Sequence, residues 1–505
     1  MAEPQVLIVG AGPTGLVLAL WLAKAGVPFR VIDQKGEPGG ASRAMAVQAR
    51  TIEFYRQLGF ADAVVAAGFR LDRLHLRNES GEIATVPLGD AGRGESPYPF
   101  ALSLPQDDHE RLLTEQLHAA GHAVEWNTTL LGFTQSPTGV RADLRKRGTT
   151  TSWAGEYLCG CDGARSVVRH GLGVGFPGGT YDQLFYVCDA EAEGNWSARD
   201  INGYIAEKTF CLAFPVRQPG MFRFIGYVPP ALKDREDITF ADLQAGVERV
   251  TGTRVTRVNW FSTYHVHHRV ADHFRQGRVF LSGDAGHVHS PAGGQGMNTG
   301  IGDAVNLAWK LAAVLRGRAV PEILDAYEAE RLPFARSLVA TTDRVFEAVV
   351  GKGFLARMVR SVIAPYALPF ALGFSAVRRA QFRLVSQTRI AYRESPLSDG
   401  AAVVRAGDRL PWVEGADNFA PLTSLDWQVH VYGTAAAGLR TFAAGVELPV
   451  HEWAWSDAAR HAGLAENALY LVRPDGYIGL ARGTQDVEAL RSYLGRFGIV
   501  AGPGK

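Results

Sequence analysis

Cysteine is scarce in this chain of 505 residues. There are four cysteines, at Cys159, Cys161, Cys188 and Cys211, and none follows Cys211. The spacing lacks the closely spaced pairs that typify zinc sites, and four cysteines are too few for a disulfide framework in a chain this long. We therefore expect a protein of a reducing compartment, the cytoplasm.

An excess of charge of either sign is also lacking. The chain has 52 Lys and Arg against 51 Asp and Glu, and its formal net charge is +1. Nucleic-acid-binding proteins carry a large positive excess, so we expect no nucleic-acid partner. The N-terminus lacks the charged and apolar regions of a secretory signal, because it enters a strand-like run at once.

A membrane-spanning run is missing as well. Residues 361–377 are 17 uncharged residues, but Pro365, Pro369 and Gly373 interrupt them, and a transmembrane helix needs about 20 apolar residues. Arginines crowd the surrounding stretch 351–393, which suits a membrane surface, helices packed on the rest of the fold, or a dimer contact. We favour packed helices or a dimer contact, and we expect no transmembrane span.

Ligand patterns for a metal ion are also missing. Six histidines lie close together in the sequence: His265, His267, His268, His273, His287 and His289. No HExxH motif or paired CxxC accompanies them. The run from Tyr264 to His268 alternates like a strand instead. We therefore expect no metal site.

The N-terminus carries a dinucleotide-binding pattern. An apolar run at 6–9 predicts a short buried strand, the segment 10–15 reads GAGPTG, and a helix pattern follows at 16–25. A second strand is predicted at 29–32, and it ends on Asp33. A glycine-rich turn without a ligand would not require this acid, so we expect dinucleotide binding.

The glycines of this pattern have separate roles. Gly10 makes the tight turn, Gly12 admits a pyrophosphate, and Gly15 lets helix and strand pack closely. Asp33, about 20 residues downstream of the motif, is placed to accept hydrogen bonds from ribose hydroxyls.

The segment from Gly283 to Lys310 is the most informative part of the chain. An apolar run at 279–281, a Gly-Asp-Ala turn with a Gly/Pro-rich loop, and an amphipathic run at 301–315 predict strand, loop and helix. The helix start would aim free N–H groups at an anion or a polarised ring edge. Four glycines let backbone approach a ligand closely there: Gly293, Gly294, Gly296 and Gly300.

A third motif lies between these two. The run 156–159 looks like a strand entering a turn, and the turn reads Gly-Cys-Asp-Gly-Ala-Arg-Ser over residues 160–166. Asp162 and Gly163 form a turn dipeptide, which alone would indicate nothing more than a turn.

Together, and in this order, the three motifs resemble those of the flavoprotein aromatic hydroxylases, the family of para-hydroxybenzoate hydroxylase. The continuation SPAGGQGMN at 290–298 is the most specific part. The resemblance covers residues 5–400 and continues more weakly to the end. It is greatest to the branch of phenol-type, hydroxyphenylpropionate and polyketide hydroxylases that carry a thioredoxin-like tail.

The resemblance implies an α/β fold, with a glutathione-reductase-type FAD-binding domain, an inserted β-rich substrate domain and a small thioredoxin-like C-terminal domain. The expected bounds are 1–75, 100–175 and 276–395 for the FAD-binding domain, 76–99 and 176–275 for the substrate domain, and 400–505 for the C-terminal domain. Because the last contains no cysteine, we exclude thiol exchange and expect a structural or dimer-supporting role.

The resemblance also implies an FAD-dependent monooxygenase that hydroxylates a small phenolic substrate. NADPH or NADH would reduce the flavin, and molecular oxygen would form a flavin C4a-hydroperoxide whose distal hydroxyl goes to a ring carbon. The protein would position the partners and exclude water. A base that removes the phenol proton would help, but no residue is identified as that base.

Other functions stay open on the sequence. A related flavin oxygenation, such as Baeyer–Villiger insertion or inactivation of a polyphenolic antibiotic, uses the same motifs. A non-catalytic binding protein on this fold, like the prenyl-protein escorts, is a remote alternative, since those have lost flavin-loop glycines that are present here.

The expected FAD contacts follow motif by motif. Arg43 would neutralise phosphate, Gln106 would reach the ribityl region, and Asp284 would bind ribityl or pyrophosphate-side groups. Backbone amides of the loop before 301 would stabilise negative charge on the reduced ring. Each of these residues also has a structural alternative: Arg43 as a surface arginine, Gln106 as a plain helix start and Asp284 as a helix N-cap. The other expected contacts are Gly10, Gly12, Pro13, Thr14, Gly15, Asp33, Asp162, Pro291, Gly294, Gly296, Met297 and Asn298.

Six aromatic residues of the strand-rich part are candidates for contact with the substrate: Tyr204, Phe210, Phe214, Phe222, Phe224 and Tyr227. They lie in alternating strands, so half of them must face the other side. A monomer and a homodimer both fit the sequence.

Overall fold

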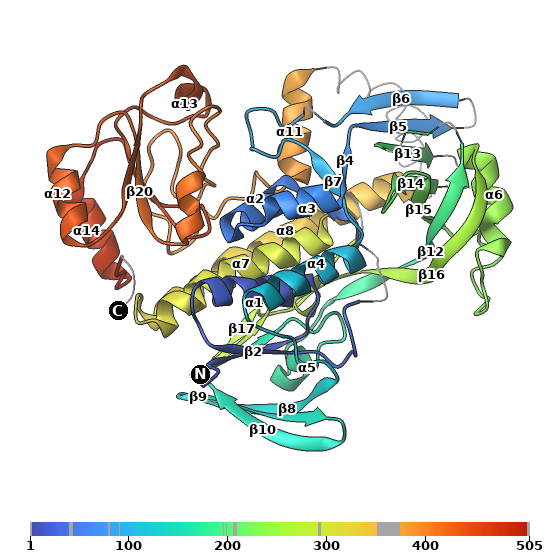
Figure 1. Ribbon diagram of the computed structural model, residues 1–505, viewed down its shortest axis with the longest axis horizontal. Coiled ribbons are helices and arrows are strands. Elements are labelled where there is room, and N and C mark those ends of the chain that lie inside the picture. Colours follow the sequence, from blue (N-terminus) through green and yellow to red (C-terminus); the bar gives the residue numbers. More distant parts are fainter. Residues whose placement is uncertain are drawn as a thin grey trace.

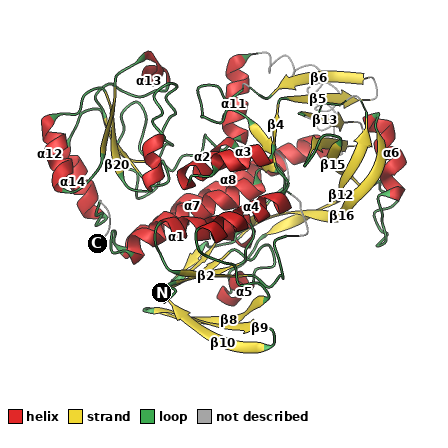
Figure 2. Ribbon diagram, viewed as in Figure 1, coloured by secondary structure: helices red, strands yellow, loops and turns green. Residues whose placement is uncertain are grey.

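The structure is a computed structural model that describes residues 3–39, 44–78, 81–89, 91–194, 196–197, 199–205, 210–290, 294–350 and 374–501. Three parts follow one another across the molecule: a smaller C-terminal unit, a central α/β part, and a curved sheet with one outer helix (Figure 1). Helices and strands are both abundant (Figure 2), as expected for the α/β fold class.

A five-stranded sheet in the order β17-β18-β11-β1-β2 forms the centre of the α/β part. Strands β2, β1, β11 and β18 run parallel, and their residues are almost all buried. Each of the three motifs begins where β1, β11 or β18 ends, so all three meet at the carboxyl edge, where such sheets bind ligands. The bounds are β1 (Val6–Val9), β2 (Phe29–Ile32), β11 (Tyr157–Gly160), β17 (Arg275–Gln276) and β18 (Val279–Leu281).

Long helices cover one face of this sheet, and a three-stranded ribbon lies beyond the opposite face (Figure 1). Helix α1 is buried over most of its length, because α4 and α7 pack against it. The helices are α1 (Pro13–Lys24), α2 (Ala49–Leu58), α3 (Ala61–Ala67), α4 (Gln106–Ala119), α5 (Val167–Leu172), α7 (Gly296–Leu315) and α8 (Asp325–Val350). The small sheets are β3 (Ala46–Val47), β7 (Ala101–Ser103) and β4 (Phe69–Leu71), and β8 (Thr128–Ser136), β9 (Gly139–Lys146) and β10 (Thr149–Gly155).

An eight-stranded sheet in the order β19-β16-β12-β15-β14-β13-β5-β6 forms the strand-rich part. Helix α6 (Ala241–Thr251) covers its outer face, where an apolar cluster packs between sheet and helix (Figure 1). The strands are β5 (Arg73–Asn78), β6 (Gly81–Pro87), β12 (Gly178–Glu193), β13 (Asp200–Ile205), β14 (Phe210–Pro215), β15 (Met221–Tyr227), β16 (Arg254–Val270) and β19 (His287–Val288).

The C-terminal unit has the thioredoxin arrangement. Its sheet has the order β21-β20-β22-β23, with β20 parallel to β21 and antiparallel to β22. Helices α12 and α14 pack together beside it. This confirms the predicted fold class. The elements are β20 (Gln428–Tyr432), α12 (Ala437–Gly445), β21 (Val450–Trp453), α13 (Asp457–His461), β22 (Leu469–Val472), β23 (Ile478–Arg482) and α14 (Val487–Arg496).

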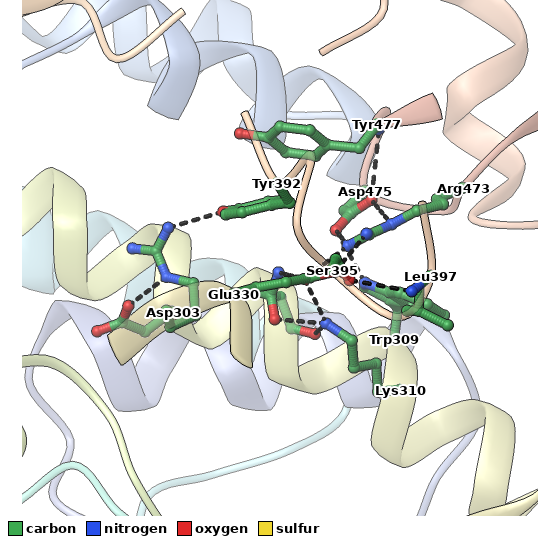
Figure 3. Close-up of polar contacts among 12 residues, drawn as sticks. Asp303, Trp309, Lys310, Glu330, Tyr392, Ser395, Leu397, Arg473, Asp475 and Tyr477 are labelled. Atoms are coloured by element: carbon green, nitrogen blue, oxygen red, sulfur yellow. Dashed lines mark hydrogen bonds and ion pairs between the residues drawn. The ribbon is translucent and has the colours of Figure 1, made fainter. Parts of the chain in front are cut away.

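Buried charges join this unit to the central helices (Figure 3). Glu330 on α8 accepts from Arg473 of the C-terminal unit at 2.6 and 3.0 Å and from Lys310 on α7 at 2.9 Å. Asp475 pairs with Arg473 at 2.6 Å and accepts from the indole of Trp309 at 2.9 Å. Burial lowers the pKa of Lys310 to about 8, opposed by Glu330. The unit is therefore fixed to α7 and α8 by ion pairs shielded from water.

Only the end of the basic stretch 351–393 can be compared with its prediction, because residues 351–373 lie outside the described part. Helix α11 (Ser375–Val385) places Phe382 against Gly92 and pairs Arg383 with Glu95 at 2.6 Å. No helix in the described ranges is long and apolar enough to span a membrane.

Candidate cofactor site

The glycine-rich turn after β1 is tightly packed at two of its three motif glycines. Gly10 has φ +103°, and a Cβ there would lie 2.3 Å from the carbonyl oxygen of Cys161. A Cβ on Gly15 would lie 1.9 Å from the carbonyl oxygen of Gly10. A Cβ on Gly12, the N-cap of α1, would meet no atom of the described residues within 4 Å. Gly12 therefore leaves space where the helix presents free N–H groups, as a phosphate requires.

Asp33 is bound to the same turn. Its Oδ2 accepts from the amide of Ala11 at 2.8 Å and its Oδ1 from the amide of Lys35 at 2.8 Å. An ionised carboxylate has about four acceptor positions. Two amides therefore orient the group and leave acceptor capacity for ribose hydroxyls.

Thr14 connects the N-terminal turn to the late motif. A Cβ on Gly283 would lie 2.6 Å from Thr14 Oγ1, and one on Gly300 would lie 2.4 Å from it. Both glycines thus make room for the threonine where α1 and α7 lie side by side (Figure 1). The structure gives Thr14 a packing role at the junction of two motifs far apart in sequence.

Gln106 and Glu110, one turn apart on α4, bind the backbone amides of Ala44 and Gly39. Gln106 accepts from the amide of Ala44 at 3.3 Å and donates to Glu110 at 2.8 Å, while Glu110 accepts from the amide of Gly39 at 2.8 Å. Arg43 itself lies outside the described residues. Sequence reasoning missed Glu110, although its i, i+4 spacing from Gln106 is a signal of a pair on one helix face.

Asn298, in the first turn of α7, ties that helix to strand β3. Its amide group donates to the carbonyls of Ala46 and Gly294 at 2.8 and 2.9 Å. Its Oδ1 accepts from the amide of Gln48 at 2.9 Å and the hydroxyl of Thr51 at 2.7 Å. The side chain therefore positions the helix start, whose first backbone amides have no acceptor within the helix.

The side chain of Met297 contacts a buried histidine, His109. His109 Nδ1 lies 3.4 Å from Met297 Sδ, and His109 Nε2 lies 2.8 Å from the hydroxyl of Tyr55. Burial lowers the pKa of His109 to about 3, so the ring is neutral near neutral pH. This uncharged chain of contacts orients the first turn of α7 without adding charge beside it.

Asp303 organises the late motif, and sequence reasoning missed it. Its carboxylate accepts from the amide of Gly283 at 3.0 Å, lies 2.7 Å from His287 Nε2, and pairs with Arg331 at 2.6 Å. Burial alone would raise the pKa of Asp303, but Arg331 and His287 hold it below its ordinary value. His287 therefore belongs to the packing of the motif, and the repeated Gly-Asp-Ala at 302–304 was the available signal.

Asp162 supports the start of helix α5, whose N-cap is Ser166. Its carboxylate accepts from the hydroxyl of Ser166 at 2.6 Å and from the amide of Val168 at 3.1 Å. Burial raises the pKa of Asp162, and these hydrogen bonds oppose the rise. Beside it, the buried Arg169 donates to the carbonyl of Ala285 at 2.8 Å, which joins the middle motif to the late one.

The other residues predicted to contact FAD lie at separate places in the structure. Asp284 is exposed in a short 3-10 turn, Gly283–Ala285, and Gly294 has φ +62° close to Ala46. Gly296 is the first residue of α7, and Pro13 the first of α1. Pro291 lies outside the described residues.

The aromatic candidates of the eight-stranded sheet separate onto its two faces. Phe222 and Phe224 are buried under α6, and Tyr204 packs against the same cluster. Phe210 and Tyr227 contact each other on the opposite face, with ring centroids 5.1 Å apart. The division expected from strand alternation is thus observed, and it leaves an aromatic face away from α6.

This aromatic face is turned toward the cofactor motifs. Arg223, on the same side of β15 as Tyr227, is buried and pairs with Asp189 at 2.6 Å. Its guanidinium also donates to the carbonyl of Ala44 at 3.2 Å, beside Gln106. The sheet is therefore attached to the central part with its aromatic face inward.

Comparison with known proteins identifies the family. The profile of the family described as an FAD binding domain matches residues 3–342. The chain belongs to this family. The 6-methylpretetramide 4-monooxygenase of Streptomyces rimosus is 35% identical to it, over 96% of this chain and 92% of the relative. The pentachlorophenol 4-monooxygenase of Sphingobium chlorophenolicum is 34% identical, over 82% and 76%.

A solved structure agrees with these relatives. The anhydrotetracycline hydroxylase OxyS from Streptomyces rimosus matches the whole of both chains with a TM-score of 0.79 and 28% identity. This flavoprotein is therefore an FAD-dependent aromatic monooxygenase that uses NAD(P)H and molecular oxygen, which confirms the predicted family, cofactor and activity. Hydroxylation is favoured over the other flavin oxygenations and over a non-catalytic role.

Proposed function

We propose that this monooxygenase hydroxylates a ring carbon of a fused-ring phenol held against the aromatic face of the eight-stranded sheet. The observation that carries the proposal is the set of aromatic rings in mutual contact on that face. Phe185 lies 4.8 Å from Tyr227 and 5.7 Å from Tyr264 between ring centroids. Tyr227, Tyr264 and Phe210 remain half-buried, so they offer ring faces to a planar ligand.

Two relatives support a substrate of several rings. One is named for 6-methylpretetramide and the other for anhydrotetracycline, and both align with nearly the whole of this chain. A large apolar contact area with few polar groups is typical of sites for such ligands.

We place FAD between the starts of two helices. Its pyrophosphate would lie at Gly12 and the N-terminus of α1, its ribose at Asp33, and its ring system at the first turn of α7. A flavin held there would supply the redox chemistry: hydride uptake from NAD(P)H and activation of oxygen. The amides of Gly296 and Met297 would stabilise negative charge on the reduced ring. The other proposed contacts are Gly10, Pro13, Thr14, Gly15, Arg43, Gln106, Asp162, Asp284, Pro291, Gly294 and Asn298.

We also propose a role for each part of the chain. Residues 1–75, 100–175 and 276–395 would bind FAD, 76–99 and 176–275 would bind the substrate, and 400–505 would support the structure. All four cysteines are free and buried, which supports a cytoplasmic protein. The assembly would be a monomer or a homodimer.

The test is NADPH and NADH oxidation by the FAD-loaded protein over a panel of single-ring phenols and fused-ring phenols, with product masses. Faster oxidation with a fused-ring phenol and a product gaining one oxygen atom would support the proposal. Hydroxylation of single-ring phenols alone would contradict the fused-ring substrate. Oxidation that yields only hydrogen peroxide would mean that the compound binds as an effector and is not the substrate.

A further inference from the structure

Strand β19 brings the late motif to the edge of the eight-stranded sheet. It pairs antiparallel with β16, with Arg269 opposite Val288 and Val270 opposite His287. Continued by one residue, this register sets His268 opposite His289. Since side chains alternate between faces, both histidines lie on the same side of the sheet as His287. The rings of His287 and His289 are in fact stacked, 6.5 Å apart.

One ring nitrogen of His289 has no hydrogen-bond partner among the described residues. Its Nδ1 lies 2.8 Å from the carbonyl oxygen of Ser290, and a carbonyl can only accept, so Nδ1 carries the proton. Its Nε2 is buried and has no hydrogen-bond partner among the residues that the structure describes. Burial, with the neighbouring His287, lowers the pKa of His289 to about 4, so the ring is neutral. Nε2 is therefore a hydrogen-bond acceptor.

The position of this nitrogen links the sheet to the flavin loop. A Cβ placed on Gly296, the first residue of α7, would lie 3.7 Å from His289 Nε2. A group that donates to Nε2 would thus lie next to the helix start at which we place the flavin ring.

His268, which the continued register sets opposite His289, has a second buried nitrogen. Its Nδ1 also lacks a hydrogen-bond partner within the described ranges. The ring is held in place by the edge of Tyr181, 4.7 Å away between centroids, and Tyr181 in turn donates to Asp343 on α8. His268 alternates with Tyr264 and Val266 on β16, so it continues the aromatic face toward the flavin loop.

We propose that His289, with His268 beside it, is the polar end of the substrate-binding face and that His289 Nε2 accepts a hydrogen bond from a hydroxyl group of the phenolic substrate. This inference rests on the proposed function. A buried acceptor without a donor is costly, and a methyl ether cannot supply the donor. Losing this hydrogen bond should weaken binding about 5- to 150-fold, which corresponds to the 1–3 kcal/mol of an unpaired buried group.

The experiment compares binding of 2,6-dihydroxyanthraquinone and its dimethyl ether to the FAD-loaded protein, followed by the change in flavin absorbance. The wild type should bind the phenol at least 5-fold more tightly than the ether, as the estimate for an unpaired acceptor requires. His289→Phe should bind both compounds equally, because it keeps an aromatic ring and removes the acceptor. His289→Gln, which retains a carbonyl acceptor, should keep part of the preference.

The matched control is His265→Phe, an exposed histidine on β16, the strand of His268; this variant should keep the full preference. Equal binding of phenol and ether by the wild type, or no binding of either, would overturn the inference. A preference that survives in His289→Phe would also overturn it. If the Phe variant fails to retain FAD, the Gln variant and the wild-type comparison decide the outcome.

The result is separable from the proposed function. If the wild type hydroxylates fused-ring phenols but binds the phenol and its ether with equal affinity, only the proposed role of His289 is refuted. A preference that depends on His289, without hydroxylation of any fused-ring phenol, would remove the proposed reaction and leave the binding site.

Discussion

The glycine motif allows the cofactor space and the fold to be tested separately. In Gly12→Ala, the new methyl group meets no atom within 4 Å in the part of the chain that the structure describes, and the residue has φ −74°, which alanine adopts freely. In Gly15→Ala, the methyl group would lie 1.9 Å from the carbonyl oxygen of Gly10. The first change should therefore affect FAD binding, and the second should affect the fold itself.

The magnitudes follow from these contacts. Alanine is a poorer N-cap than glycine, so Gly12→Ala should cost the apoprotein about 1 kcal/mol. Its methyl group would enter the space proposed for the pyrophosphate, and an overlap of this size costs about 1–3 kcal/mol, or about 5- to 150-fold in Kd for FAD. Gly15→Ala must displace backbone, so it should lose about 1–3 kcal/mol or more from the apoprotein before FAD is added.

The assay is a thermal melt of each apoprotein followed by an FAD titration monitored by flavin fluorescence. The control is Gly438→Ala, on α12 of the C-terminal unit, where a Cβ would likewise meet no described atom within 4 Å. It should leave the Kd for FAD unchanged. If Gly12→Ala binds FAD with the affinity of the wild type, the pyrophosphate does not lie at this turn.

Buried polar contacts elsewhere lead to three more expectations. Glu330→Gln removes the carboxylate that Arg473 and Lys310 share, which should cost about 3–5 kcal/mol of folding free energy. Calorimetry should therefore show a lower Tm for this variant and an unchanged Tm for the control Glu322→Gln, whose residue is exposed. Equal Tm values for the two variants would contradict the reasoning. Burial would raise the pKa of Glu330, but Arg473 and Lys310 hold it well below the ordinary 4.5, so this stabilisation is complete above pH 4.5 and lost as the pH falls below it. Urea unfolding below pH 4.5 should therefore lose stability more steeply in the wild type than in Glu330→Gln. Asn298→Ala leaves buried groups unpaired at about 1–3 kcal/mol and should speed FAD release in stopped-flow fluorescence; an unchanged rate would show that the start of α7 is held by other contacts.

The three glycine motifs could be predicted from the sequence because their constraints are local. A turn such as that at Gly10 needs φ above zero, and the close approach at Gly15 admits no side chain, so the residue types themselves mark these positions. The parallel order of the strands then brings the motifs together. The thioredoxin-like unit could be predicted only through resemblance, since its short strands have no equally specific pattern.

Asp303 could not be found in the same way. Its partners Gly283 and Arg331 lie 20 and 28 positions away in the sequence, and an acid within a helix is usually a solvated residue. The two faces of the eight-stranded sheet were predictable as an alternation, but only the structure shows that α6 covers Phe222 and leaves Tyr227 inward. Tertiary partners, rather than local pattern, decide such cases.

Two neighbouring residues on α8 explain why a tail without cysteines stays attached to this enzyme. Glu330 is held by Arg473 of the C-terminal unit, and the next residue, Arg331, pairs with Asp303, which binds the amide of Gly283 in the late motif. Without the tail, Glu330 would keep Lys310 but lose its arginine, in a part of α8 that is buried. Arg331 follows Glu330 directly on α8. A shift of this helical turn would therefore also move Arg331 and, through Asp303, the amide of Gly283 at the proposed flavin site. We therefore propose that the C-terminal unit supports the flavin motif structurally, a role that needs charge and burial but no thiol.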